Sequence, residues 1–347
     1  MQTTSRAKDT TAAPVFQRLP FVPGSLFFIL LLAGCAADSP SILDPRGPAA
    51  TSIAELWWLI FGLGTVIFLL VMVALGLALF RRRSSTASET GGSTRNDNRV
   101  ILWAGIIGPA IVLIVIFALS VRTMAMLSST TPGAEFVVHV TGHQWWWEVQ
   151  YPNQAVETAN EIHIPVGQPI LVRLSTEDVI HNFWIPNLHG KMDMVPGQTN
   201  EFWIQADTAG EYWGECAEFC GIQHAKMRFV VVAEPLAEFT AWLDQQRAVP
   251  PAPVDALAQR GQQIFLGSAC VYCHAVEGTN ATGDLGPNLT HLASRRTLAA
   301  GVLLNTRGNL AGWLTGPQHI KPGNLMPPTE LTGDELQALL AYLDTLE

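Results

Sequence analysis

Two long stretches without a charged side chain lie in the first third of the 347-residue chain. One runs from Leu56 to Phe80 and the other from Val100 to Val121. Each is longer than the roughly 20 apolar residues that an α-helix needs to cross the hydrocarbon core of a bilayer. A surface helix of a globular protein has a polar face, which both stretches lack. The sequence therefore predicts a transmembrane hairpin over 50–125.

A shorter apolar stretch precedes the hairpin and has the layout of an export signal. It runs from Phe21 to Ala33 and follows three basic residues. It ends in Leu32-Ala33-Gly34-Cys35, which resembles the cleavage box of bacterial lipoproteins. We therefore expect a signal over 1–34 and take Cys35 as a candidate for lipidation. Ordinary export with an unmodified Cys35 is the alternative.

The charges around the two spans predict their orientation. Five arginines lie between them or at their inner ends: Arg81, Arg82, Arg83, Arg95 and Arg99. Short loops rich in arginine stay in the cytoplasm. Everything after about Arg122 is therefore expected on the periplasmic, outer face of a bacterial inner membrane, with membrane lipid around the spans. This exported part has 10 Lys and Arg against 23 Asp and Glu, which favours basic protein partners and argues against nucleic acid.

The exported part begins with a region that reads as β-structure. From Glu135 to Ala233, short runs of β-branched and aromatic residues are separated by Gly/Pro/Asn clusters. Strands are expected at 136–140, 169–174 and 228–232. The spacing predicts an all-β sandwich or barrel over 133–235. A helix at 236–247 and a stiff proline-rich stretch follow, which predicts a linker over 236–254.

The last region, 255–347, returns to helical apolar spacing at its two ends. Helices are predicted over Asp255–Phe265 and Gly333–Leu346, and Thr332 to Glu335 resembles a capping box. The middle is rich in glycine and proline. The sequence therefore predicts an all-α domain with an irregular centre.

Four side chains that bind soft metals occur within twelve residues of the β-region: Cys216, Cys220, His224 and Met227. Thiolate, thioether and imidazole ligands suit copper. A mononuclear blue-copper site has one thiolate, whereas two thiolates this close can bridge two copper ions, each completed by one histidine. His181, 35 residues before Cys216, is the candidate for the second histidine. A Cys216–Cys220 disulfide is the alternative.

This string, with Gly142-His143-Gln144-Trp145-Trp146-Trp147 upstream, resembles subunit II of haem–copper cytochrome c oxidases over roughly Ser52 to Pro235. The resemblance implies a cupredoxin fold, which is a Greek-key barrel or sandwich, and a binuclear copper A centre. Trp145 falls where the family has the aromatic residue through which electrons enter.

The resemblance also assigns the ligands. It implies that Cys216 and Cys220 bridge both copper ions and that His181 and His224 each bind one. Met227 and the main-chain carbonyl of Glu218 would be the weak ligands. The carboxylate of Glu218 would in addition be a candidate for a magnesium ion at the contact with subunit I.

The sequence Cys270-Val271-Tyr272-Cys273-His274 is a haem c attachment motif. Two thiols add to the vinyl groups of the haem, and His274 is thereby placed as the proximal ligand of the iron. Met326 is the one methionine after Met227 and is the candidate for the distal ligand. His291 or His319 are the alternatives.

The segment from Ala256 to Leu346 resembles a monohaem class I cytochrome c. Gly286-Pro287-Asn288-Leu289 matches the turn that this family has in front of the proximal histidine. The resemblance implies that the carbonyl of Pro287 accepts a hydrogen bond from His274. A C-x-x-C pair alone would also fit a thiol–disulfide motif or half of a zinc site, but the adjoining His274 argues against both.

Together the two regions resemble subunit II of a caa-type cytochrome c oxidase, with a cytochrome c domain fused behind the copper domain. Electrons would pass from an external donor, such as a cytochrome c or a quinol–cytochrome c reductase, through one haem c to copper A. They would continue to the haems of subunit I, where oxygen is reduced to water with proton translocation. Neither span contains a histidine, so the membrane haems are expected in that partner and not in this chain.

Two other functions stay open at this point. One is a membrane-anchored carrier that feeds a different terminal reductase, and the other is a copper-delivery or redox-sensing lipoprotein. The remaining histidines are expected to be ordinary polar residues: His139, His143, His163, His189, His291 and His319.

Overall fold

The computed structural model describes residues 40–81, 98–128 and 135–347. The predicted export signal, Cys35 and the loop arginines Arg82, Arg83 and Arg95 lie outside these ranges.

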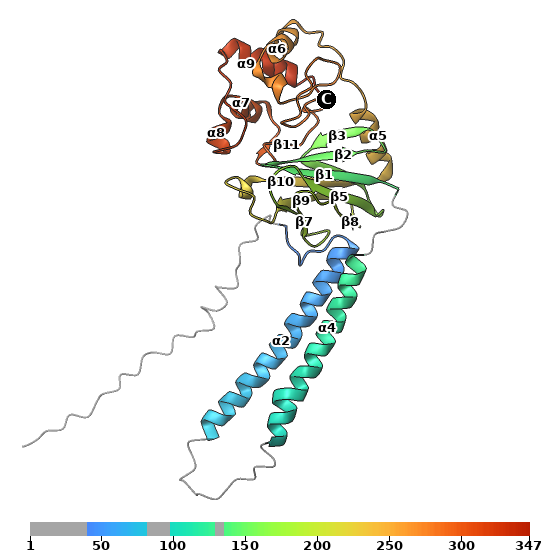
Figure 1. Ribbon diagram of the computed structural model, residues 1–347, viewed down its shortest axis with the longest axis vertical. Helices are drawn as coiled ribbons and strands as arrows, with labels where there is room; N and C mark the ends of the chain where they lie inside the picture. Colours follow the sequence, from blue (N-terminus) through green and yellow to red (C-terminus); the bar gives the residue numbers. More distant parts are fainter. Residues whose placement is uncertain (1–39, 82–97, 129–134) are drawn as a thin grey trace, which may run out of the picture. The chain divides into compact units, whose positions relative to one another are not determined.

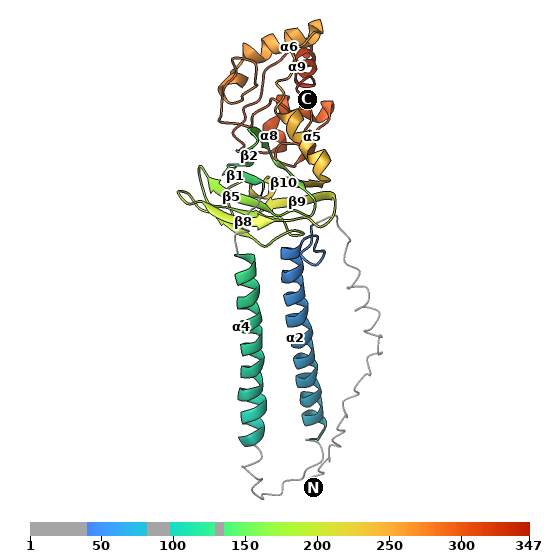
Figure 2. The ribbon, with the colours of Figure 1, turned by 90° about the vertical axis from the view of Figure 1, so that its right-hand side faces the viewer.

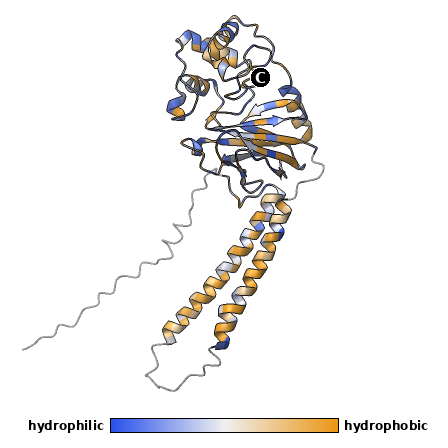
Figure 3. Cartoon of the chain, in the orientation of Figure 1, coloured by the Kyte–Doolittle hydropathy of each residue, from blue (hydrophilic) through white to orange (hydrophobic). Residues whose placement is uncertain are grey.

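Two long helices side by side form the predicted hairpin (Figures 1 and 2). The first is α2, Pro48–Arg81, which begins before the uncharged stretch. The second starts at Asn98 and runs through a π-helical segment, η2 (Ile101–Ile107), into α4 (Gly108–Leu127). Figure 3 shows both helices as almost uniformly hydrophobic, and their most apolar windows have no buried residues. Both helices are long and apolar enough to cross a membrane.

The π-helical segment in the second helix ends just before Pro109. Proline has no amide hydrogen, so the carbonyl one turn earlier loses its usual partner. A wider turn at that point is an ordinary response of a helix to the missing hydrogen bond.

Residues 135–234 form two five-stranded sheets, which we call the β domain (Figure 1). The sheets have the strand orders β3-β2-β1-β5-β8 and β4-β10-β9-β6-β7. The strands are β1 Val137–His143, β2 Trp146–Tyr151, β3 Val156–Ala159, β4 Glu161–Pro165, β5 Ile170–Thr176, β6 His181–Trp184, β7 Met192–Met194, β8 Asn200–Ile204, β9 Gly210–Cys216 and β10 Arg228–Glu234. The three strands expected from the sequence correspond to β1, β5 and β10.

The core of the β domain is aromatic. The rings of Phe183 and Phe229 stack with centroids 4.4 Å apart, and Trp147 meets both edge-on. All three side chains are fully buried. Strands β1, β2 and β5 alternate between buried and partly exposed residues, as expected for sheets with one face in a core. Trp147 also approaches His181, so this core lies directly beneath the predicted copper ligands.

Helix α5 (Leu236–Gln246) packs on strands β3 and β4 of the β domain. Its Phe239 meets Phe136 edge-on, and its Trp242 stacks on His163 with ring centroids 4.0 Å apart. The proline-rich stretch 249–253 therefore starts from a fixed point on the β domain.

Residues 256–347 form the predicted helical domain. Its elements are α6 Ala256–Leu266, η4 Ala269–Tyr272, β11 Thr297–Leu298, β12 Leu303–Leu304, α7 Arg307–Thr315, α8 Pro317–Ile320 and α9 Gly333–Leu343. Helices α6 and α9 pack closely together around Phe265 and Tyr342. Asp255 caps α6, and Thr332 forms the predicted capping box with Glu335 at the start of α9. The order of hairpin, all-β domain and all-α domain is confirmed.

One predicted helix end was wrong. Helix α9 stops at Leu343 and not at Leu346. The amide of Ala293 donates to the carbonyl of Leu346, which holds the last residues in a turn and buries the Leu346 side chain. This contact joins residues more than 50 positions apart, so the local helical pattern does not contain it.

We expect Gly261→Ala to destabilise the helical domain, because a Cβ at Gly261 would collide with the carbonyl oxygen of Ala338 on α9. Overpacking of this kind costs about 1–3 kcal/mol. Calorimetry of the full chain in detergent would measure it. Gly308→Ala on α7 is the control, since a Cβ there meets nothing within 4 Å. Equal melting temperatures for the two variants would contradict the prediction.

Candidate functional site

The pairing of three strands brings the predicted copper ligands together. Strand β9 ends at Cys216 and β10 begins at Arg228, so Cys220, His224 and Met227 lie on the loop between them. His181 begins β6, which pairs with β9 in antiparallel fashion. The distant histidine therefore reaches the start of the loop through the sheet. Nothing in the local sequence around His181 requires this.

One half of the cluster lies around Cys216. Its Sγ is 3.9 Å from Nδ1 of His181 and 3.2 Å from the main-chain oxygen of Glu218. The other half lies around Cys220, whose Sγ is 3.8 Å from Nδ1 of His224 and 3.8 Å from Sδ of Met227. Each half thus has one thiol, one imidazole and one weak donor.

The two halves meet through the sulfur atoms. Sγ of Cys216 lies 3.8 Å from Sγ of Cys220, and both cysteines are free and buried. The disulfide left open by the sequence is therefore not formed in this structure. The contact between the two thiols lowers the pKa of Cys216 and raises the pKa of Cys220. One thiolate is thus stabilised before any metal is considered.

Asp178 orients the His181 ring, and the sequence analysis missed this residue. Its Oδ1 lies 2.8 Å from Nε2 of His181, and its carboxylate also accepts the main-chain amides of Gln144 and Val179 at 2.6 Å each. Partial burial tends to raise the pKa of Asp178, but the hydrogen bonds from His181 and the two amides lower it overall. An ionised carboxylate can only accept, so Nε2 is the donor and Nδ1 is left as the ligand atom.

The His181 ring also depends on a glycine in β1. A Cβ at Gly142 would lie 2.9 Å from Cδ2 of the ring. No side chain fits there without moving the histidine. Both features are visible in the sequence, as Asp-x-x-His at 178–181 and as the glycine before His143. Their role depends on the contact between β1 and the start of β6, so the sequence alone does not reveal it.

Trp145 is joined to the cluster by a hydrogen bond. Its indole Nε1 donates to the main-chain oxygen of Cys220 at 3.1 Å, and the side chain of Gln144 donates to the same oxygen at 2.7 Å. Trp145 is partly buried and packs against the core of the β domain. Two residues of the Trp-rich motif therefore hold the loop that carries the cysteines.

The donor set fits the metal implied by the sequence. Sulfur, imidazole and thioether donors are what copper prefers. The ligand atoms of His181, Cys216 and Cys220 all lie within 4.8 Å of one another. The carboxylate of Glu218 is different, because this residue is exposed on the loop. Its main-chain carbonyl is the group that lies against the cluster, 3.2 Å from Sγ of Cys216.

The haem attachment motif lies on the short helix η4 and the residue pair after it. Cys270 and Cys273 are free and partly buried. Nδ1 of His274 is 2.7 Å from the carbonyl oxygen of Pro287. A carbonyl only accepts, so Nδ1 carries the hydrogen and Nε2 is left with its lone pair. Burial lowers the pKa of His274, which keeps the ring neutral and able to bind iron.

Met326 lies at the edge of the core of the helical domain, partly buried against it. Its amide donates to Oδ1 of Asn324, and its carbonyl accepts from the side chain of Gln318. The alternative ligand His291 is buried and engaged elsewhere, with Nδ1 2.6 Å from the main-chain oxygen of Glu347. Partly buried apolar residues, Cys270, Val271 and Leu303 among them, adjoin the same core. These surroundings fit a haem, which is a large apolar plane.

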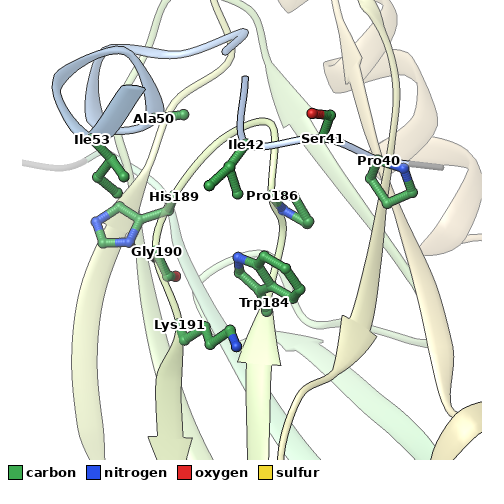
Figure 4. A pocket seen from close by; sticks show the side chains of 10 residues that line it. All are labelled: Pro40, Ser41, Ile42, Ala50, Ile53, Trp184, Pro186, His189, Gly190 and Lys191. Carbon is green, nitrogen blue, oxygen red and sulfur yellow. Dashed lines mark hydrogen bonds between the residues drawn. The ribbon is translucent and has the colours of Figure 1, made fainter. Parts of the chain in front are cut away.

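A cavity of about 500 Å³ near the start of α2 is separate from both sites (Figure 4). Ile42, Ile53 and Trp184 give it an apolar lining, and Lys191 places its ammonium 4.6 Å from the centroid of the Trp184 ring. None of the predicted metal or haem ligands lines it.

The histidines expected to be ordinary polar residues have structural contacts. Buried His163 pairs with Glu234 at 2.9 Å, and His143 lies 3.1 Å from Glu148. Buried His189 packs edge-on against Phe202.

Comparison with known proteins supports the family resemblance of both regions. The family described as "Cytochrome C oxidase subunit II, periplasmic domain" matches residues 153–234, and the family described as "Cytochrome c" matches 258–347. Cytochrome c oxidase subunit 2 of Alkalihalophilus pseudofirmus is 34% identical over 337 residues, which cover 94% of this chain and 96% of the relative. The protein of the same name from Bacillus sp. strain PS3 is 33% identical, with 92% and 94% covered.

One solved structure is reported for its similarity. The periplasmic domain of subunit II of cytochrome oxidase of Bradyrhizobium japonicum is 31% identical and covers 34% of this chain and 97% of its own, with a TM-score of 0.33.

We expect Asp178→Asn to weaken copper binding by about 10–100-fold, as the loss of a partner that orients a ligand histidine usually does. Copper retained in the presence of a competing chelator is the measurement. Glu177→Gln is the matched control, because this neighbouring carboxylate is exposed. Equal retention in the two variants would exclude a role of Asp178 in holding His181.

We expect Met326→His to lower the reduction potential of the haem, because replacing a thioether with a second imidazole removes the ligand that raises it. A redox titration followed by the haem absorption bands is the measurement. His319→Gln should leave the potential unchanged. If His319→Gln shifts it and Met326→His does not, His319 is the distal ligand.

Proposed function

This chain belongs to the cytochrome c oxidase subunit II family, in the caa-type form with a fused cytochrome c domain, and from this premise we propose the route that electrons take through it. The chain is a membrane-anchored subunit of a haem–copper oxidase and has the electron-accepting role in that complex. What the proposal adds is the identity of the groups and the order in which they act.

The convergence of four further donors on two adjacent thiols carries the proposal. Cys216 and Cys220 would bridge two copper ions, with His181 and His224 as the terminal ligands and Met227 and the Glu218 carbonyl as the weak ones. When bound, such a copper pair takes up and releases one electron shared between both ions, with little change in geometry.

The helical domain would carry one haem c. Cys270 and Cys273 would attach it, and His274 and Met326 would bind the iron. The contact of His274 with the Pro287 carbonyl would fix the ring and strengthen its donation to iron. Electrons from an external cytochrome c or a quinol–cytochrome c reductase would enter at this haem and continue through the Trp145 region to copper A.

The copper centre would then pass electrons to the haems of subunit I, where oxygen is reduced with proton translocation. The exposed carboxylate of Glu218 would bind magnesium at the contact with that subunit. The hairpin would lie in the inner membrane of a bacterium with both domains on the periplasmic face, and Cys35 would carry lipid.

Burial of the ligands argues against a copper-delivery or sensing function. His181 and Met227 are 0% exposed, Cys220 3% and Cys216 5%. A protein that hands on its metal needs ligands that the recipient can reach. Copurification with a haem protein of many spans would separate an oxidase subunit from a carrier that serves another reductase.

Metal analysis and EPR of the purified complex test the proposal directly. Two copper ions and one haem c iron in this chain, with a signal from one electron shared by both coppers, are expected. One copper with a localised signal would overturn it.

We expect Cys216→Ser to interrupt the route between the two centres. The haem c content should be unchanged, while the shared copper signal and the oxidase activity are lost. Donor should still reduce haem c, which should then fail to become reoxidised in air. Ala225→Ser, at an exposed position on the same loop, is the matched control. Normal reoxidation in Cys216→Ser would exclude copper A from the route.

A further inference from the structure

The helical domain contacts the copper loop through one short segment, Ile320 to Asn324. The side chain of Gln223 donates to the carbonyl of Pro322, and Nζ of Lys226 donates to the carbonyl of Ile320 at 2.5 Å. Gln223 is next to the proposed copper ligand His224, and the segment ends two residues before the proposed iron ligand Met326. The segment Ile320 to Asn324 thus contacts the copper loop at one end of the interface and leads directly to the proposed iron ligand.

Lys321 lies in the middle of this segment and is almost completely buried, with 3% of its surface exposed. Its Nζ donates to the carbonyl of Trp145 in the β domain at 3.0 Å and to the carbonyl of Ala299 in the helical domain at 3.2 Å. Burial, with the nearby charge of Lys226, lowers the pKa of Lys321 to about 7. Because a neutral amine still has two hydrogens, both bonds persist in either protonation state.

A buried carboxylate makes a second link on the other side of the contact. Glu161 of β4 is 3% exposed. Its Oε1 accepts the main-chain amides of Arg296 at 2.5 Å and Thr297 at 3.2 Å. Two consecutive amides of the helical domain are therefore satisfied by a side chain of the β domain. The main-chain amide of Arg228 in the β domain also donates to the carbonyl of Ala300 in the helical domain at 3.0 Å.

These contacts differ from ordinary surface ion pairs. The exposed pair Arg296–Glu211 also joins the two domains, but such pairs contribute little to stability. Lys321 and Glu161 are buried, and Nζ of Lys321 and Oε1 of Glu161 bond main-chain groups of the helical domain. Oε2 of Glu161 lies 3.9 Å from Nε2 of His163. If the domains separated, the two side chains would need water as a hydrogen-bond partner. The main-chain carbonyls and amides that they bond would lose their partners at the same time.

We propose that Lys321 and Glu161 are positioning residues that lock the helical domain onto the β domain, so that the haem is a fixed relay and does not swing on the proline-rich stretch 249–253. Lys321 also fixes the carbonyl of Trp145, whose indole is bonded to Cys220. The lock thus sets the distance that an electron crosses between the two centres. The electron-transfer consequence rests on the proposed function, whereas the docking itself does not.

Amide hydrogen exchange of the purified oxidase tests the docking without any electron transfer. Lys321→Met and Glu161→Met keep side chains of similar length and remove the donor of Lys321 and the acceptor of Glu161. We expect peptides that contain Arg296 and Thr297, or Trp145, to exchange about tenfold faster or more in the double variant, since buried polar groups then lack partners. Arg260→Met and Glu238→Met, both at exposed positions, are the matched controls.

Pulsed reduction of haem c tests the consequence. In the unaltered oxidase, transfer to copper A should not depend on solvent viscosity, because no domain moves. In the double variant it should slow by about tenfold or more and become viscosity-dependent, with unchanged copper EPR and haem spectra. If one variant fails to assemble, the other still tests its own link.

Unchanged exchange and unchanged transfer in the double variant would overturn the lock, as would viscosity-dependent transfer in the unaltered oxidase. Absence of copper or haem from the unaltered oxidase would instead overturn the proposed function, while the exchange experiment would still report on the docking.

Discussion

The central constraint on this structure is that the thiols of Cys216 and Cys220 are held in contact in the protein interior without forming a disulfide. Cys216 is fixed because it ends a strand paired on both sides, by β6 and by β10. Cys220 has no strand and is fixed instead through its carbonyl, which accepts hydrogen bonds from Gln144 and Trp145. The aromatic core packs beneath the cluster and supports the backbone that carries both cysteines. Without that framework the same six donors would be a flexible loop with no defined spacing.

The contacts that hold the copper loop extend from the β domain into the helical domain. The carbonyl of Trp145 is bound by Lys321, and the loop residues Gln223 and Lys226 bind the segment that leads to Met326. The environment of the copper loop is therefore completed by residues about 100 positions later in the chain. Fusion of the two domains here does more than raise a local concentration, because the second domain forms part of the surroundings of the first.

The fold class and the donors were predictable from the sequence because their signals are local. Uncharged length predicted the spans, cysteine and histidine spacing predicted both cofactor motifs, and Asp255 and the Thr332–Glu335 pair predicted where the terminal helices begin. Strands such as β6 and β7 have no such signal, and α7 and α8 lie within a glycine- and proline-rich stretch. Asp178, Glu161 and Lys321 were missed for a different reason. Each works through a partner on another element, so its role exists only after the sheets and domains have come together.

Burial of the sulfur pair has a consequence for how the chain matures. The exported compartment of bacteria favours oxidation of neighbouring thiols, and a stabilised thiolate at Cys216 is the reactive form. If the cluster binds copper as proposed, copper binding and closure of a Cys216–Cys220 bridge would exclude each other, because a disulfide leaves no thiolate to hold a metal. Maturation of such a centre would thus need both thiols to be reduced at the moment when copper arrives.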